Sequence, residues 1–209
     1  MSSDAAMHDV AVLGFQGNVS EHVEAVFRAL DRLELPGGAR ATTDPDRIRR
    51  STALSIPGGE STTISKLIAK RGLKESVIEL AASGRPVMGT CAGLILLSRH
   101  VNGRDTSSDP GFPAIMDAHV SRNAFGRQRE SFETEIEIRL PGGVLRETGI
   151  FIRAPLIEST SSGCQPVAWV DGRVVAALQG NVLGTCFHPE LTEDSRLYEF
   201  LLRRGGKSM

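Results

Sequence analysis

The sequence lacks an excess of either charge, because 24 Lys and Arg stand against 25 Asp and Glu, for a net charge of −1. No overall field draws such a chain toward nucleic acid or an anionic membrane, and a small neutral or zwitterionic substrate fits better. It also lacks a run of roughly 18 apolar residues, the length of a spanning helix, and its first nine residues lack the basic and apolar regions of a leader peptide. We expect a soluble, cytoplasmic protein with no membrane or nucleic-acid partner.

Cysteine is scarce: the chain has Cys91, Cys164 and Cys186, and none of them stands in CxxC spacing. This number and spacing argue against a disulfide framework and against a structural zinc site, so we expect reduced thiols. The signatures GxGxxG and GxxxxGK(S/T) are also missing, which removes support for a dinucleotide site or a P-loop. The sequence predicts no cofactor and no metal.

Strand and helix patterns alternate through the first half of the chain. A short apolar stretch ends at a glycine turn, residues at helical spacing follow, and the pattern then recurs. The predicted elements are strands over residues 10–15, 53–56 and 86–89, and helices over 19–33, 61–71, 74–83 and 92–100. This order predicts a doubly wound, three-layer α/β sheet, in which ligands bind at the carboxyl ends of the strands.

The second half is richer in short strands. Residues 102–111 are polar, as in a surface loop, and residues 132–140 alternate as a half-buried strand does. Further strands are predicted over 149–152, 167–170, 174–178 and 182–187, and a last helix over 194–203. Short links favour antiparallel pairing. We therefore predict a mixed, mostly parallel sheet with an antiparallel extension, in one domain over residues 8–203 with flexible tails at 1–7 and 204–209.

A nucleophile is indicated where a predicted strand meets a helix, at Gly89-Thr90-Cys91-Ala92-Gly93. Glycines two residues to either side of Cys91 leave room for a tight, strained turn that lifts the thiol off the sheet, as in a nucleophile elbow. The helix N-terminus that follows favours the thiolate. A free cysteine is more commonly a small buried apolar residue, but the flanking glycines favour a nucleophile.

A thiolate nucleophile needs a base that can also protonate a leaving amine, and histidine is the usual one. His188 follows the strand over 182–187 and precedes Pro189, which favours an extended backbone. In an extended chain Glu190 points the same way and can orient the ring. Either residue alone could be an ordinary strand-end residue, but the pair and the elbow both fall where strand ends should converge.

The other four histidines fit this role less well. His100 would lie about 13 Å from Cys91 along one helix, at about 1.5 Å per residue. His8 stands near the start of the chain, and His22 and His119 are interpreted as surface or structural residues.

A second strand-end turn, Gly58-Gly59-Glu60-Ser61, offers backbone N–H groups for an oxyanion hole, although Pro-Gly-Gly also forms ordinary loops. Several arginines could pair with a substrate carboxylate, although most surface arginines are only solvated. They are Arg122, Arg127, Arg129 and Arg153.

With these residues in view, the sequence resembles the glutaminase subunits of pyridoxal 5′-phosphate synthase, a branch of the class I, triad-type glutamine amidotransferases. The resemblance covers nearly the whole chain, with departures at Cys186, where serine is common, and in the polar loop near residues 106–109. The segments that carry it are VLGFQG (12–17) with Glu21-His22, PGGESTT (57–63), GTCAGLI (89–95), RNAFGRQ (122–128), FIRAP (151–155) and FHPEL (187–191).

The resemblance implies a flavodoxin-like fold and hydrolysis of L-glutamine to L-glutamate and ammonia through a thioester on Cys91, with His188 and Glu190 completing the triad. Ammonia would pass to the synthase subunit in a large hetero-oligomer, and docking would activate a glutaminase that is weakly active alone. The glutamine-binding residues that the resemblance implies are Gly58, Gly59, Glu60, Ser61, Arg122, Ile152 and Arg153, with Gly59 and Ala92 at the oxyanion site.

Three alternatives stay open on the sequence. Another class I glutaminase, such as that of imidazole glycerol phosphate synthase, is disfavoured by residues 122–128 and 151–155. A non-catalytic regulatory subunit is disfavoured because Cys91, His188 and Glu190 occur together. A thiol peptidase on a related fold is the third, and glutamine turnover would separate it from the others.

Overall fold

Five parallel strands form one end of a single β-sheet in the computed structural model, which describes residues 7–122, 131–161 and 163–205. All but the edge strand are almost wholly buried, as expected of strands covered on both faces. In their order across the sheet they are β2 (Gly37–Thr42), β1 (His8–Leu13), β3 (Ala53–Ile56), β4 (Val87–Thr90) and β13 (Val182–Thr185).

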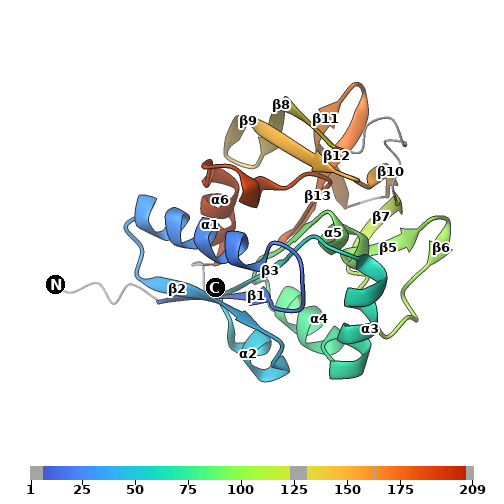
Figure 1. Ribbon diagram of the computed structural model, residues 1–209, viewed down its shortest axis with the longest axis horizontal. Helices are drawn as coiled ribbons and strands as arrows, with labels where there is room; N and C mark the ends of the chain where they lie inside the picture. Colours follow the sequence, from blue (N-terminus) through green and yellow to red (C-terminus); the bar gives the residue numbers. More distant parts are fainter. Residues whose placement is uncertain (1–6, 123–130, 162, 206–209) are drawn as a thin grey trace.

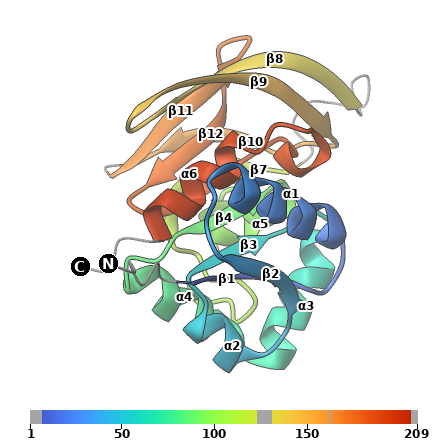
Figure 2. The same cartoon turned by 90° about the vertical axis from the view of Figure 1, so that its left-hand side faces the viewer.

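Helices cover both faces of these strands (Figures 1 and 2). One face carries α1 (Val19–Arg32) and α6 (Arg196–Gly205), which pack against each other. The opposite face carries α2 (Pro45–Arg50), α3 (Ser61–Arg71) and α4 (Lys74–Ala82), while the short α5 (Ala92–Leu97) follows β4 directly. No helix in the described ranges is long and apolar enough to cross a membrane.

An antiparallel extension begins at β12 (Arg173–Gln179), which pairs with β13. The sheet continues through β10 (Leu156–Thr160), β7 (Met116–Ser121), β5 (Ser98–Val101) and β6 (Arg104–Asp105), and in this part β5 and β7 pair in parallel. A branch from β12 runs through β11 (Cys164–Val170) to the long hairpin of β8 (Ser131–Leu140) and β9 (Gly143–Ile152), at the top of Figure 2. The predicted doubly wound sheet with its antiparallel extension is confirmed.

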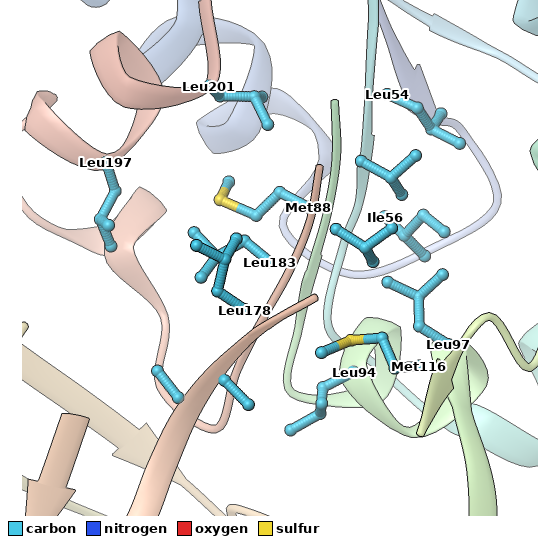
Figure 3. Packing of buried hydrophobic residues seen from close by; sticks show 14 of the residues in the cluster. Leu54, Ile56, Met88, Leu94, Leu97, Met116, Leu178, Leu183, Leu197 and Leu201 are labelled. Atoms are coloured by element: carbon cyan, nitrogen blue, oxygen red, sulfur yellow. The ribbon is translucent and has the colours of Figure 1, made fainter. Parts of the chain in front are cut away.

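Apolar side chains fill both sides of the central strands (Figure 3). Leu197 of α6 lies on the same side as Met88 and Leu183, whereas Leu94 of α5 and Met116 lie on the opposite side. All five side chains are at most 1% exposed. Because β4 and β13 are packed from both faces, the residues at their carboxyl ends are held on a rigid support.

The helix predicted over residues 92–100 is too long, because α5 ends at Leu97. The Ser98 hydroxyl donates to the Leu94 carbonyl at 2.7 Å and the backbone of Ser98 is extended, so the chain leaves the helix and enters β5. His100 therefore lies on β5 and not on the helix that follows Cys91. Its ring stacks on that of His119 on β7, with 4.1 Å between centroids.

Several other elements differ from the prediction. No element was predicted for β2, α2, β7 or β10, and η1 (Pro189–Leu191) forms a single 3₁₀ turn just after His188. His8, expected near an unstructured start, begins β1 and is buried, and Thr106, in the predicted surface loop, is 3% exposed. The last helix continues to Gly205, beyond the predicted end at 203, while residues 1–6 and 206–209 of the predicted tails lie outside the described residues.

Two glycines allow the tight turn between β4 and α5. A methyl group on Gly93 would collide with the Ile56 carbonyl oxygen, and one on Gly89 would come within 2.6 Å of the Gly93 backbone. Neither glycine has a positive φ, so it is close packing of β3, β4 and α5 that requires them.

We predict that Gly93→Ala lowers the free energy of unfolding by about 1–3 kcal/mol or more, because the Ile56 backbone must move to admit the methyl group. Gly38→Ala is the matched control, since its methyl group would meet only the Phe27 ring, at 3.6 Å. Urea unfolding of both variants measures the difference. Equal midpoints for Gly93→Ala and Gly38→Ala would contradict this packing account.

Candidate active site

A cleft of about 240 Å³ opens at the carboxyl ends of β3, β4 and β13. It brings together most of the site residues that the sequence predicts, from segments more than a hundred positions apart. The predicted residues that line it are Cys91, His188, Gly58, Gly59, Glu60, Ser61, Arg122, Ile152 and Arg153. Gly17, Asn18 and Ile95 line it as well and were not predicted.

Cys91 occupies the turn between β4 and α5 in a strained backbone conformation, with φ 50° and ψ −102°. A non-glycine residue in such a region costs about 1–3 kcal/mol and persists only where its surroundings fix it. Its N–H donates to the Thr185 carbonyl of β13 at 2.8 Å, and its carbonyl accepts from Ile95 at 3.2 Å. The side chain is 8% exposed, and Sγ lies 4.0 Å from the Ile152 carbonyl oxygen. The thiol therefore reaches the cleft from a fixed position.

His188 lies just beyond the end of β13, where its N–H donates to the Ile150 carbonyl of β9 at 2.9 Å. Its ring packs directly on Gly58, because a methyl group there would come within 2.5 Å of Cε1. The same methyl group would lie 3.4 Å from Cβ of Cys91. The lack of a side chain at Gly58 thus leaves room for the His188 ring next to Cys91.

Glu190 contacts the other side of the His188 ring, with 2.7 Å between Oε1 and Nδ1. The Asn18 side-chain amide also donates to Oε1, at 3.1 Å. Burial alone would raise the pKa of Glu190, but the hydrogen bond from His188 and the contact with His22 outweigh burial and hold that pKa well below its usual range. The carboxylate is ionised although its residue is only 3% exposed.

Contacts with Cys91 and Glu190 keep a proton on His188. Burial alone would lower the pKa of His188, but hydrogen bonds to Cys91 and Glu190, together with their charges, raise it to about 10. The ring is therefore an imidazolium at neutral pH. A cationic imidazole next to a cysteine is the environment typical of nucleophilic cysteines.

Glu60 and Arg153 face each other at the mouth of the cleft, with 3.4 Å between Oε1 and Nη2. Both side chains are more than half exposed, so each charge is available to a ligand. Arg153 has a positive φ of 43°, at the end of the hairpin strand β9. Gly59 also has a positive φ, 135°, beside Glu60.

The remaining predicted residues are placed less directly. Ala92 is the first residue of α5 and is 1% exposed, so only its backbone N–H can serve the cleft. Arg122 lines the cleft, and its own N–H donates to Asn102 Oδ1 at 2.9 Å. Residues 123–128 of the predicted segment 122–128, which include Arg127, lie outside the described residues, and so does Arg129. Among residues whose placement is described, no group of three or more His, Cys, Asp and Glu could hold a metal ion.

His22, interpreted from the sequence as a surface or structural residue without a partner, is fully buried beside Glu190. Its Nε2 lies 3.4 Å from Glu190 Oε1. The sequence did carry a signal for its burial, because His22 occupies the apolar stripe of α1 at helical spacing. That buried stripe is His22, Ala25, Val26, Ala29 and Leu30.

Comparison with known proteins identifies the family of the chain. Residues 12–206 match the SNO glutamine amidotransferase family. "Pyridoxal 5′-phosphate synthase subunit PdxT" of Archaeoglobus fulgidus is 47% identical over 95% of this chain and 99% of its own length, and the protein of the same name from Thermococcus gammatolerans is 46% identical over the same shares.

A solved structure of a similar protein has the same fold. A crystal structure of a glutamine amidotransferase, 39% identical, superimposes with a TM-score of 0.82 and covers 95% of this chain and 99% of that one. Because the family match and these identities extend over nearly the full length, the chain belongs to the SNO glutamine amidotransferase family.

Proposed function

We propose that this chain hydrolyses L-glutamine to L-glutamate and ammonia and delivers the ammonia to the synthase subunit of pyridoxal 5′-phosphate synthase, for vitamin B6 biosynthesis. The observation that carries the proposal is the convergence of Cys91, His188 and Glu190 at one cleft, in a member of a glutamine amidotransferase family. The relatives that match along their whole length are, by name, subunits of that synthase.

The geometry supports a two-step reaction. In the first step the Cys91 thiolate attacks the side-chain amide carbon, and the His188 imidazolium gives its proton to the leaving ammonia. A γ-glutamyl thioester and a neutral imidazole remain. In the second step His188 takes a proton from water, the resulting hydroxide attacks the thioester, and glutamate leaves as the thiolate and imidazolium are restored. Glu190 stabilises the charged ring before and after each turnover.

The cleft also offers groups for the rest of the substrate. Glutamine carries an α-carboxylate and an α-ammonium, and the mouth of the cleft carries Arg153 and Glu60, of opposite charge. We assign these side chains, with Arg122 and the backbone around Gly58, Ser61 and Ile152, to substrate binding. The N–H groups of Gly59 and Ala92 are assigned to the developing oxyanion.

The proposal extends to the cellular compartment, the domain and the partner of the enzyme. Cys91, Cys164 and Cys186 are free and buried, which suits a reducing compartment, and we place the reaction in the cytoplasm. We further propose that residues 8–203 act as a single glutaminase domain. The synthase subunit would dock in a large hetero-oligomer and receive ammonia directly.

We predict that Cys91→Ala lowers the rate of glutamine hydrolysis by at least about a thousandfold, because removal of a nucleophile abolishes the covalent route. Cys164→Ala, in a buried thiol of β11 outside the cleft lining, is the matched control and keeps the wild-type rate. Glutamate release by purified protein with its synthase subunit measures both. Wild-type turnover by Cys91→Ala would refute the assignment of the nucleophile.

We predict that glutamate release rises when the cognate synthase subunit is added to the purified chain. The oxyanion turn contains Gly58 and Gly59, which fix their backbone weakly, so docking of a partner can set the N–H groups in place. The assay compares initial rates with and without the partner at saturating glutamine. Equal rates under both conditions would count against activation by docking.

A further inference from the structure

His22 contacts both the acid of the proposed triad and the strand that ends at the nucleophile. Its Nε2 lies 3.4 Å from Glu190 Oε1 and 3.2 Å from Oγ1 of Thr90, the residue before Cys91. All of these side chains are buried. His22 therefore connects, through one rigid ring, the two segments whose relative position sets the distance between thiol and imidazole.

The contacts of the ring determine which nitrogen carries the proton. A carboxylate only accepts hydrogen bonds, so a lone pair on Nε2 facing Glu190 would be repelled, whereas an N–H is attracted. On the other side, Nδ1 lies 2.8 Å from the Ser55 hydroxyl and 2.9 Å from the Tyr198 hydroxyl. Burial and the nearby charge of Glu190 hold the pKa of Tyr198 well above its usual value, so this hydroxyl keeps its proton and can donate. The contacts thus favour an Nε2–H that faces both Thr90 Oγ1 and Glu190 Oε1, with Nδ1 as acceptor.

The position of the Glu190 carboxylate depends on the donors around it, because the contacts recorded for this group all involve one of its two oxygens. Oε1 is approached by His188 Nδ1, Asn18 Nδ2 and His22 Nε2, at 2.7, 3.1 and 3.4 Å. The second oxygen, Oε2, is buried and has no hydrogen-bond partner in the part of the chain that the structure describes. The orientation of the carboxylate, and through it that of the His188 ring, is set at a single oxygen.

We propose that His22 is a positioning residue for glutamine hydrolysis: its Nε2–H holds Glu190 against His188, while Ser55 and Tyr198 hold the His22 ring from behind. His22 does not line the cleft, so it acts through Glu190 and not on the substrate. The inference rests on the proposed glutaminase function and adds to it a buried residue outside the triad.

Steady-state kinetics with the synthase subunit present test the proposal. His22→Leu removes the donor, and we expect kcat to fall about 10- to 100-fold with KM unchanged, the effect of losing one hydrogen bond to a charged group. His22→Gln can return an N–H near the position of Nε2, and we expect it to recover most of kcat. His100→Leu, the same substitution in a ring that stacks on His119 outside the cleft lining, is the control and keeps both constants.

A wild-type kcat in His22→Leu, or equal losses in His22→Leu and His22→Gln, would overturn the positioning role. Nitrogen NMR of the histidine rings in the wild-type protein gives a second test that needs neither variant activity nor variant folding. It should show His22 protonated at Nε2, and a ring protonated only at Nδ1 would overturn the inference. Absence of glutamate release by the wild-type complex would instead refute the proposed function. The NMR result would still decide whether His22 donates a hydrogen bond from Nε2 to Glu190.

Discussion

The buried carboxylate of Glu190 is the constraint on which the site depends. An ionised carboxylate away from water is strongly unfavourable unless cations and hydrogen-bond donors surround it. Here the donors come from the end of β13 and from the start of α1, and the strand that ends at Cys91 lies next to both. Satisfying this one charge therefore fixes where the imidazole lies, and with it the position of the ring relative to the turn that carries Cys91.

The two parts of the sheet contribute different walls of the cleft. The parallel strands supply the thiol, the imidazole and the glycine turn, because their carboxyl ends meet at one edge. The antiparallel extension supplies the opposite wall, since the Ile150 carbonyl of β9 binds the His188 N–H and both Ile152 and Arg153 line the cleft. The extension thus takes part in the site, and within the first wall the lack of a side chain at Gly58 leaves room for the His188 ring.

Much of this site was predictable because its signals are local in sequence. The glycines around Cys91 and the spacing of His188 and Glu190 were sufficient to predict that these three residues lie together, as the structure places them, while their catalytic roles stay a prediction. The extended backbone expected from His188 to Glu190 was wrong, because the chain enters a 3₁₀ turn after His188. Within this turn the two side chains still meet at 2.7 Å. His22 was missed because its partners lie 33 to 176 positions away. The end of α5 was missed because a serine hydroxyl, and no glycine or proline, ends that helix.

The most direct test of this account is the titration of the His188 ring, followed by carbon NMR in the wild-type protein and in Glu190→Gln. The contacts of His188 with Cys91 and Glu190 predict a wild-type ring that stays protonated well above pH 8, with a pKa of about 10. Replacement of the carboxylate by an amide should move that pKa down toward the ordinary histidine value. A wild-type ring that titrates near pH 6.5, unchanged in Glu190→Gln, would contradict the claim that a buried carboxylate holds an imidazolium beside the nucleophile.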